Sequence, residues 1–161
     1  EAKKLGLIKK WGVSTYTIGE LREIISKYDI DLVLLPFNIF DQRTIKSNIL
    51  KELKNRGIEI HARSTFLQGL LLVDRFKIPK KFNKWQPIFK EWEKIVKKTK
   101  LNKFQICLRY ALSNPYLDKI ILGMDSSKHF KQMIKNAGYI DLDVKKVNAS
   151  SKINLINPAK W

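Results

Sequence analysis

The sequence has almost none of the groups that build disulfides or metal centres. Its single cysteine, Cys107, cannot form an internal disulfide, and neither of its two histidines stands near it at metal-ligand spacing. No apolar run reaches the length of a membrane span, and no basic-then-apolar leader opens the chain. These absences argue against a disulfide-stapled or membrane-spanning protein, and we expect a reducing, cytoplasmic setting.

Arginine is scarce as well, although the chain is strongly basic. The formal net charge is +17, but lysine supplies 26 of the 32 basic residues and arginine only 6. Nucleic-acid surfaces rely on arginine for bidentate contacts, whereas many lysines here fall on the polar sides of expected helices, for example Lys94, Lys97 and Lys98. We interpret most of the charge as solvated helix faces, and a true anion-binding surface as the minority alternative.

Strand and helix patterns alternate along the 161 residues, which are 44% hydrophobic and enough for one domain. Strands are predicted at Lys10–Val13, Leu32–Leu35, Ile58–Ala62 and residues 118–123. Helices are predicted after Thr17, which forms a capping box with Glu20, and at Thr44–Arg56, Trp85–Lys98, Lys103–Leu112 and Ser127–Ala137. Leu32–Leu35 is apolar on both faces, which indicates a strand covered on both sides.

Two segments have no regular period. Val73–Asn83 is predicted to be a basic, irregular loop, and the last nine residues an extended segment docked by Trp161. In the last long helix, Phe130, Met133 and Ile134 fall on one face and are expected to point inward.

Strands that alternate with helices pair in parallel through right-handed crossovers. Such a chain forms either a doubly wound sheet or part of a barrel, and no G-x-G-x-x-G turn follows any strand. The predicted fold class is therefore α/β, with parallel strands and flanking helices that form half of a (β/α)8 TIM barrel. Because barrel ligands bind where strands end, the segments of interest are 12–17, 34–43, 62–69 and 122–127.

These four segments, in this order, resemble the C-terminal half of the aldo-keto reductases. A G-x-S motif ends the first strand at Gly12–Ser14, and Leu34–Asn38 stands where the family has Q-x-P-(Y/F)-N. Ser64 with Leu67 and Gly69 follows the third strand, and an I-x-G turn at Ile121–Gly123 follows the fourth. The resemblance covers about residues 2–137. It implies that residues 1–161 are a single domain, the C-terminal part of an NAD(P)-dependent oxidoreductase barrel whose N-terminal half is absent.

The family binds NADPH across the C-terminal mouth of the barrel and passes a hydride to an aldehyde or ketone. The resemblance implies that Ser14 donates to the nicotinamide carboxamide, beside Thr15, which stands where most members carry Asn. Arg63 stands where many members stack a Tyr on the nicotinamide ring, and a planar guanidinium can also stack. Ser64, Leu67 and Gly69 would line the pyrophosphate, where glycine lets the backbone approach closely.

The last unit would hold the adenosine end of the cofactor. Its matching residues are Gly123, Asp125, Ser126 and His129, which open a helix whose free N–H groups favour an anion. His129 falls where a basic residue often meets the 2′-phosphate, which implies NADP. Asp125 beside it would repel that phosphate, so NAD is the alternative cofactor. Leu34, Gln132 and Met133 also depart from the family's cofactor-binding residues.

Each of these side chains also has a structural interpretation. Ser14 can cap the turn after a strand, and Arg63 can form an internal ion pair with Asp41 or Glu59. Asn38, Asp41 and Arg43 together favour a polar loop that ties the strand end to the next helix. His61, on the third strand, is expected to be a buried residue of a barrel layer.

The chain offers no catalytic residues that we can name. The family's chemistry uses an Asp, a Tyr acid, a Lys and a His, all from the first four strands, and this chain begins after them. Tyr16 lies near a strand end, but no Lys–Asp partnership accompanies it. We expect the intact protein to be an aldo-keto reductase acting on small-molecule carbonyl substrates, and this segment alone to be inactive.

Two other functions stay open. One is a non-catalytic nucleotide-binding remnant of the same fold, and the other is a nucleic-acid-binding protein that acts through its positive charge. A half-barrel also leaves two sheet edges and an apolar face uncovered. We therefore expect the chain to require the missing half of the barrel as its partner, or to self-associate without it.

Overall fold

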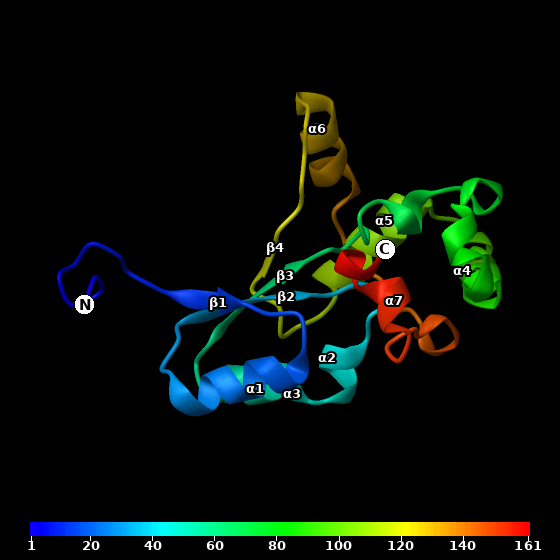
Figure 1. Ribbon diagram of the computed structural model, residues 1–161. Helices are drawn as coiled ribbons and strands as arrows, with labels where there is room; N and C mark the ends of the chain where they lie inside the picture. The colour runs from blue at the N-terminus through cyan, green and yellow to red at the C-terminus, as the bar shows by residue number, and fades with distance from the viewer.

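Four parallel strands form the centre of the molecule, and they lie side by side in the order in which they occur in the chain. The computed structural model describes residues 1–161 (Figure 1). The strands are β1 Gly12–Ser14, β2 Leu32–Pro36, β3 Glu59–Arg63 and β4 Lys119–Ile120, in the sheet order β1-β2-β3-β4. Ser14 pairs with Leu34, Pro36 with Arg63 and Ala62 with Ile120. This α/β topology is that of successive barrel units, as the sequence predicts.

Seven α-helices and five 3₁₀ turns connect and cover the strands. The α-helices are α1 Ile18–Lys27, α2 Arg43–Lys46, α3 Ile49–Asn55, α4 Gln86–Thr99, α5 Lys103–Leu112, α6 Ser127–Asn136 and α7 Ile153–Ile156. The 3₁₀ turns are η1 Leu70–Leu72, η2 Arg75–Lys77, η3 Lys80–Trp85, η4 Lys145–Val147 and η5 Pro158–Lys160. None of these helices combines the length and the apolar character that crossing a bilayer requires.

The two faces of the sheet are covered unequally. Helices α1 and α3 lie along one side of β1–β3 (Figure 1), and there Val33, Leu35, Ile60 and Ala62 are almost completely buried. Among the alternating residues, Leu32, Leu34 and His61 are only half-buried, although Pro36 at the end of β2 is buried. The prediction that β2 is covered on both sides is therefore wrong for this chain. The second face would point into the interior of a closed barrel.

Charged side chains gather at the start of this open face. The Glu59 carboxylate accepts hydrogen bonds from Lys10 and, at 2.8 Å, from Lys119, and it lies 2.7 Å from His61 Nε2. These three partners hold the pKa of Glu59 well below its usual range. His61 is thus a half-buried residue of the open face that contacts Glu59, and not the buried one that we expected.

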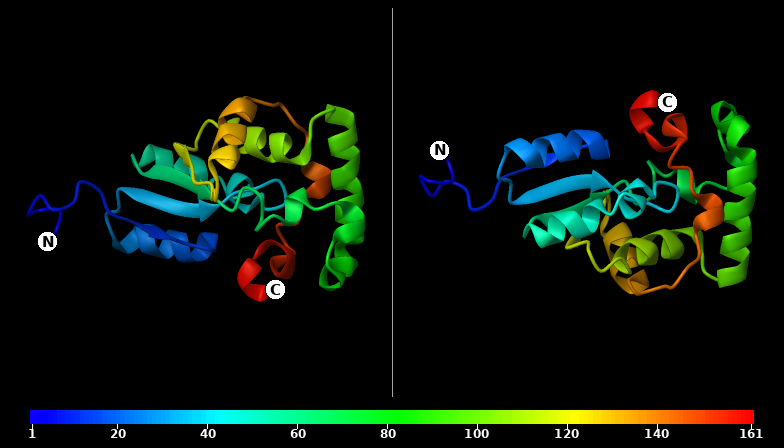
Figure 2. Two further views of the ribbon diagram at one scale, coloured as in Figure 1. Left: turned by 90° about the horizontal axis from the view of Figure 1, so that it is seen from above. Right: turned by 90° about the horizontal axis from the view of Figure 1, so that it is seen from below.

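A second core lies beyond the carboxyl ends of the strands. Figure 2 shows β2 pointing toward α4, which stands across this end of the sheet. Phe40 from the loop after β2 packs edge-on against Phe89 of α4, and the Trp92 indole donates to the Leu71 carbonyl at 3.1 Å. This core fixes the loops after β2 and β3 against α4 and α5.

Several local predictions need correction. The expected helix Thr44–Arg56 is two helices, α2 and α3, separated at Asn48, whose φ is 57°. Residues 73–83 form η2 and most of η3 rather than an irregular loop, and the C-terminal nine residues form α7 and η5 rather than an extended segment. Trp161 does dock: its indole donates to the Leu155 carbonyl at 3.2 Å and its ring meets Phe82 edge-on.

Helix α6 differs from its expected packing. It stands away from the strands (Figure 1), and none of its residues is buried. Phe130 and Ile134, predicted to point inward, are 48% and 62% exposed, and Met133 is half-buried. Their apolar face is real, but the chain covers only part of it, where α6 meets α5.

Candidate functional site

The loops that follow the four strands meet at one edge of the sheet. Because the strands are parallel, their carboxyl ends lie together, and the side chains that follow them share this edge. The loops after β3 and β4 enclose a hollow of about 390 Å³. Its lining comprises Arg63, Ser64, Thr65, Phe66, Gln68, Gly69, Ile121, Leu122 and Gly123.

The loop after β3 has an unusual main chain. Ser64, Leu67 and Gln68 have φ values of 60°, 47° and 52°, and Gly69 follows at 81°. Turns of this kind can leave successive main-chain amides free to bind an anion. Gly69 adopts the left-handed conformation without strain. The three other residues are held there by local contacts, such as the 2.9 Å bond from the Leu67 amide to the Ser64 carbonyl.

The hollow offers several hydrogen-bond donors without a partner in the protein. The amides of Ser64, Thr65, Phe66, Gln68 and Gly69 donate to no protein acceptor. Thr65 Oγ1 is buried and also has no partner. An unsatisfied buried hydroxyl is costly, so Thr65, together with these free amides, makes the hollow a candidate place for a polar ligand.

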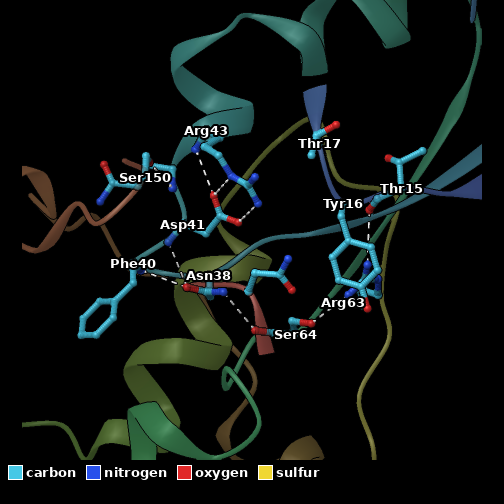
Figure 3. Close-up of polar contacts among 12 residues, drawn as sticks. Thr15, Tyr16, Thr17, Asn38, Phe40, Asp41, Arg43, Arg63, Ser64 and Ser150 are labelled. Carbon is cyan, nitrogen blue, oxygen red and sulfur yellow. Dashed lines mark hydrogen bonds and ion pairs between the residues drawn. The ribbon is translucent and has the colours of Figure 1, made fainter. Parts of the chain in front are cut away.

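Arg63 is the one charged residue that lines this hollow. Its Nη1 donates to Ser64 Oγ and its Nη2 to the Thr15 carbonyl, both at 3.2 Å (Figure 3). The guanidinium also lies over the Tyr16 ring, 4.2 Å from its centroid. Neither of the ion pairs that we considered, with Asp41 or with Glu59, forms. A cation held by neutral groups keeps its charge for an anionic ligand.

A second polar network supports the loop after β3 from behind. Asn38 Oδ1 accepts from the Phe40 and Asp41 amides at 3.0 Å, and Asn38 Nδ2 donates to the Ser64 carbonyl at 3.2 Å (Figure 3). Asp41 accepts two bonds from the Arg43 guanidinium, at 2.8 and 2.6 Å, and this contact raises the pKa of Arg43. The structural interpretation of these three residues is correct, and Asn38 in addition holds Ser64 in place.

Some of the residues singled out from the sequence lie away from the hollow. Ser14 is exposed at the end of β1, and Thr15 is 2% exposed, so its hydroxyl is not presented to a ligand. Thr15 contributes its carbonyl, which anchors Arg63. The Leu67 side chain is completely buried in the core. From the predicted set, the hollow therefore brings together Arg63, Ser64, Gly69 and Gly123.

The remaining predicted residues lie at the start of α6, on the segment that Gly123 begins. Ser126 caps the helix and accepts from the His129 amide at 3.2 Å. Asp125 Oδ1 lies 2.5 Å from His129 Nδ1, and both side chains are largely exposed. Asp125 and His129 thus contact each other.

A larger hollow lies elsewhere, between α4, α5 and α6. It measures about 510 Å³ and is lined in part by Glu93, Lys103 and Phe104. The Phe104 ring stacks on Phe66 at 5.0 Å, so this aromatic pair lies between the two hollows. In the hollow between α4, α5 and α6, Lys103 already pairs with Glu93 and donates to the Val73 carbonyl at 2.7 Å. The smaller hollow, with its unpartnered donors, is therefore the better candidate site.

Other reactive groups do not form a centre. Burial raises the pKa of the Cys107 thiol, and it raises the pKa of the Tyr110 phenol to about 12. Both pack in the hydrophobic core. No cluster of His, Cys, Asp and Glu side chains could hold a metal ion.

Comparisons with known proteins bear on this arrangement. A model of the Aldo/keto reductase family matches residues 1–154. The fold is similar to aldo-keto reductase AKR11C1 from Bacillus halodurans in its holo form, with a TM-score of 0.69 at 16% identity over 99% of this chain and 56% of that one. It is also similar to the glycerol dehydrogenase AKR11B4 from Gluconobacter oxydans, with a TM-score of 0.64 at 19% identity over 98% of this chain and 52% of that one.

A third similar structure is the thermostable aldo-keto reductase Tm1743 in complex with the inhibitor epalrestat. Its TM-score is 0.61 at 24% identity, over 91% of this chain and 48% of that one. The chain therefore spans about half the length of the solved structures it resembles. A comparison with curated protein sequences found no match. The prediction of half an aldo-keto reductase barrel is confirmed at the level of family and fold.

Proposed function

Because the chain belongs to the aldo/keto reductase family, we propose that it is the cofactor-binding half of a reductase that exchanges a hydride between NADP(H) and an aldehyde or ketone. The observation that carries this proposal is the hollow after β3 and β4, whose lining includes Arg63 and five residues with unpartnered amides. A bound nicotinamide cofactor supplies the hydride. The residues of this chain bind and orient it.

The donors of the hollow suit a diphosphate. Free main-chain amides in turns and an arginine fork are groups that proteins use to bind phosphate oxygens. Thr65 Oγ1 would gain its missing partner from the same ligand. Only Arg63 carries charge among the lining residues, so no carboxylate opposes an anion there. The residues present therefore fit the pyrophosphate of a dinucleotide.

The start of α6 supports NADP with NAD as the alternative. Lys128 and His129 lie in the first turn of the helix, where the helix dipole also favours a phosphate. Asp125 opposes it, because its carboxylate is paired with His129 at 2.5 Å. A 2′-phosphate bound here would compete with Asp125 for His129, so we expect only a modest preference for NADP over NAD.

The catalytic groups belong to another part of the protein in this proposal. The chain spans about half of its structural relatives, and no Asp, Tyr, Lys and His set is assigned within it. We propose that the preceding half of the barrel supplies them, and that it completes the site for a small carbonyl substrate. The segment alone then binds the cofactor without turning over.

Cofactor titration of the purified chain tests the proposal. We expect NADPH to bind to the wild type, and Arg63→Met to weaken the affinity at least tenfold, because a buried charge-assisted contact contributes about 1.5–3 kcal/mol. Arg75→Met is the matched control, since Arg75 lies outside this hollow, and its affinity should equal that of the wild type. If no nicotinamide dinucleotide binds to the wild type, the proposal is wrong.

Activity assays separate the enzyme from the competing functions. The chain mixed with NADPH and a panel of aldehydes should show no oxidation, and clear turnover would refute the inactive-segment proposal. Joined to a preceding half-barrel with an intact catalytic set, it should turn over. Cofactor binding without turnover in that joined protein would instead favour the non-catalytic nucleotide-binding remnant.

A further inference from the structure

Phe76, in the 3₁₀ turn η2, is the most exposed of the large hydrophobic residues. Its side chain is 96% exposed, and both of its neighbours in the chain, Arg75 and Lys77, are basic. The Arg75 guanidinium lies 5.9 Å from the centroid of the Phe76 ring. A single exposed apolar side chain is ordinary on a protein surface, so what Phe76 can do depends on the groups around it.

The hollow at Phe76 brings together two separate elements of the chain. It measures about 310 Å³, and Lys97 of α4 lines it together with η2, Arg75–Lys77. The acidic residues of the lining are Asp74 and Glu93, and Glu93 is already paired with Lys103. Three cations therefore surround the Phe76 ring against one carboxylate, that of Asp74, which has no ion pair.

Helix α4 extends this positive charge along the end of the molecule that lies opposite the N-terminus (Figure 2). Lys90 and Lys94 precede Lys97 by seven and three residues, so the three lysines lie on one side of the helix. All three are exposed, whereas Phe89 and Trp92 on the other side of α4 are buried in the core. The basic side of α4 and the Phe76 turn thus form one continuous outer surface.

About half of the net charge of the protein lies in this part of the chain. Residues 75–100 contain ten basic and two acidic side chains, which leaves +8 of the total of +17. Both acidic side chains are already paired, Glu91 with Lys94 at 2.6 Å and Glu93 with Lys103. The remaining positive charge has no counterpart within the protein, and it is available to an anionic partner.

We propose that this surface binds the protein to a membrane leaflet that carries anionic phospholipids. The Phe76 ring enters the headgroup region, and the cations around it contact the lipid phosphates. An inserted apolar group and a polybasic patch together give an attachment that neither gives alone. The basic aromatic surface, as we call it below, consists of Arg75, Phe76, Lys77, Lys90, Lys94 and Lys97. It needs no cofactor, so the proposal is independent of the proposed function.

Nucleic acid is the other large anionic partner, and it fits this surface less well. Proteins that bind single strands stack successive bases on several aromatic rings. Phe76 is the one exposed ring of this segment, because the next four aromatic residues are buried, namely Phe82, Trp85, Phe89 and Trp92. Base and phosphate recognition on duplexes relies on the arginine fork, whereas four of the five cations here are lysines. A lysine charge on a flexible apolar stem suits a diffuse layer of lipid phosphates.

Vesicle flotation tests the proposal, because bound protein rises with the vesicles and self-associated protein does not. The chain should float with phosphatidylcholine vesicles that contain about 30% phosphatidylserine, and not with vesicles of phosphatidylcholine alone. Phe76→Ala should weaken this binding about tenfold, because the apolar insertion is lost, and Phe76→Leu should retain most of it. Tyr139→Ala is the matched control and should bind like the wild type, since Tyr139 is 82% exposed outside this surface.

Two triple variants separate local charge from net charge. Lys77→Gln combined with Lys90→Gln and Lys97→Gln should weaken vesicle binding roughly 10- to 100-fold, because each basic residue at an anionic leaflet contributes about a fivefold change. The control removes the same charge from exposed lysines of α2, α3 and α6, and it should change the affinity less than threefold. Its substitutions are Lys46→Gln, Lys51→Gln and Lys135→Gln.

Four results would overturn the proposal. The first is a chain that does not float with the anionic vesicles, and the second is a Phe76→Ala variant that binds them as well as the wild type. The third is an equal loss in the two triple variants, which would mean that net charge alone drives binding. The fourth is a single-stranded RNA that displaces the chain from the vesicles and binds Phe76→Ala more weakly than the wild type, which would assign the surface to nucleic acid. None of these results bears on cofactor binding.

Discussion

At the scale of single residues, Thr65 shows that the candidate site lowers the stability of the fold. Its side chain is 2% exposed and its Oγ1 has no hydrogen-bond partner. Thr44, 3% exposed in the first turn of α2, has the same defect but lines a separate small cavity near Tyr16. An unsatisfied buried hydroxyl costs about 1–3 kcal/mol. At Thr65, a bound phosphate could remove that cost.

Substituting the two threonines by the isosteric valine separates stability from binding. Thr65→Val should raise the free energy of unfolding by about 1 kcal/mol, since the apolar methyl needs no partner, and weaken NADPH binding several-fold. Thr44→Val should raise stability to a similar extent and leave NADPH affinity unchanged. Urea midpoints and cofactor titrations measure both effects. If Thr65→Val binds NADPH as well as the wild type, its hydroxyl has no part in the site.

The sequence revealed only some of these residues, for a physical reason. Ser64, Gly69 and Gly123 stand out because their residue types suit turns and close backbone approach. Gln68 contributes its main-chain amide, and Thr65 contributes its amide and its buried hydroxyl. The direction of an amide depends on the φ values of the loop, which cannot be predicted from the side chains of these residues. Tyr16 was noted for its place after a strand. Its contact with Arg63 joins positions 47 residues apart, which only the tertiary fold brings together.

At the scale of elements, capping residues in the sequence predicted where helices begin better than the apolar period predicted whether a helix is continuous. The Thr17–Glu20 capping box forms as predicted, with the Glu20 amide 3.1 Å from Thr17 Oγ1. Helix Lys103–Leu112 also has its predicted bounds. In contrast, the apolar period that suggested one helix over 44–56 continues across Asn48, because asparagine tolerates the left-handed conformation that separates α2 from α3.

The capping box of α1 gives an element-scale prediction. Thr17→Ala should lower the free energy of unfolding by about 1 kcal/mol, the usual cost of losing an N-cap side chain. Ser26→Ala is the control within the same helix, because the Ser26 hydroxyl bonds only to the Glu23 carbonyl on the exposed side, and it should change stability little. Urea denaturation of both variants measures the difference. A Thr17→Ala variant as stable as the wild type would show that packing through Leu21 and Ile25 alone fixes α1.

At the scale of the whole molecule, the uncovered surfaces share a cause. The open face of the sheet, the free edges at β1 and β4, and the exposed apolar side of α6 are the places where further barrel units would pack in the structures this chain resembles. The periodic pattern of α6 marks an apolar face that is present, but its prediction as a buried face is wrong for this chain. The chain does not itself contain what would bury it, so sequence periodicity could indicate the face but not its partner.

Two opposing forces decide what the isolated chain does with these surfaces. Apolar residues such as Leu7, Ile134 and Tyr139, which are 74%, 62% and 82% exposed, favour association. A net charge of +17 on each copy opposes it. Salt screens the charges, with a Debye length of about 30 Å at 0.01 M and about 3 Å at 1 M, but it does not weaken apolar contacts.

We therefore expect self-association that increases with salt. Light scattering after size-exclusion chromatography should show mainly small species at low ionic strength and dimers or larger assemblies at high ionic strength. Phe130→Lys combined with Ile134→Lys should suppress the larger species, because the two substitutions remove the apolar side of α6 and add like charge. A monodisperse, stably folded monomer at every salt concentration would contradict the prediction. Association that instead decreases with salt would mean that ion pairs hold the copies together, which the +17 charge makes difficult without an acidic partner.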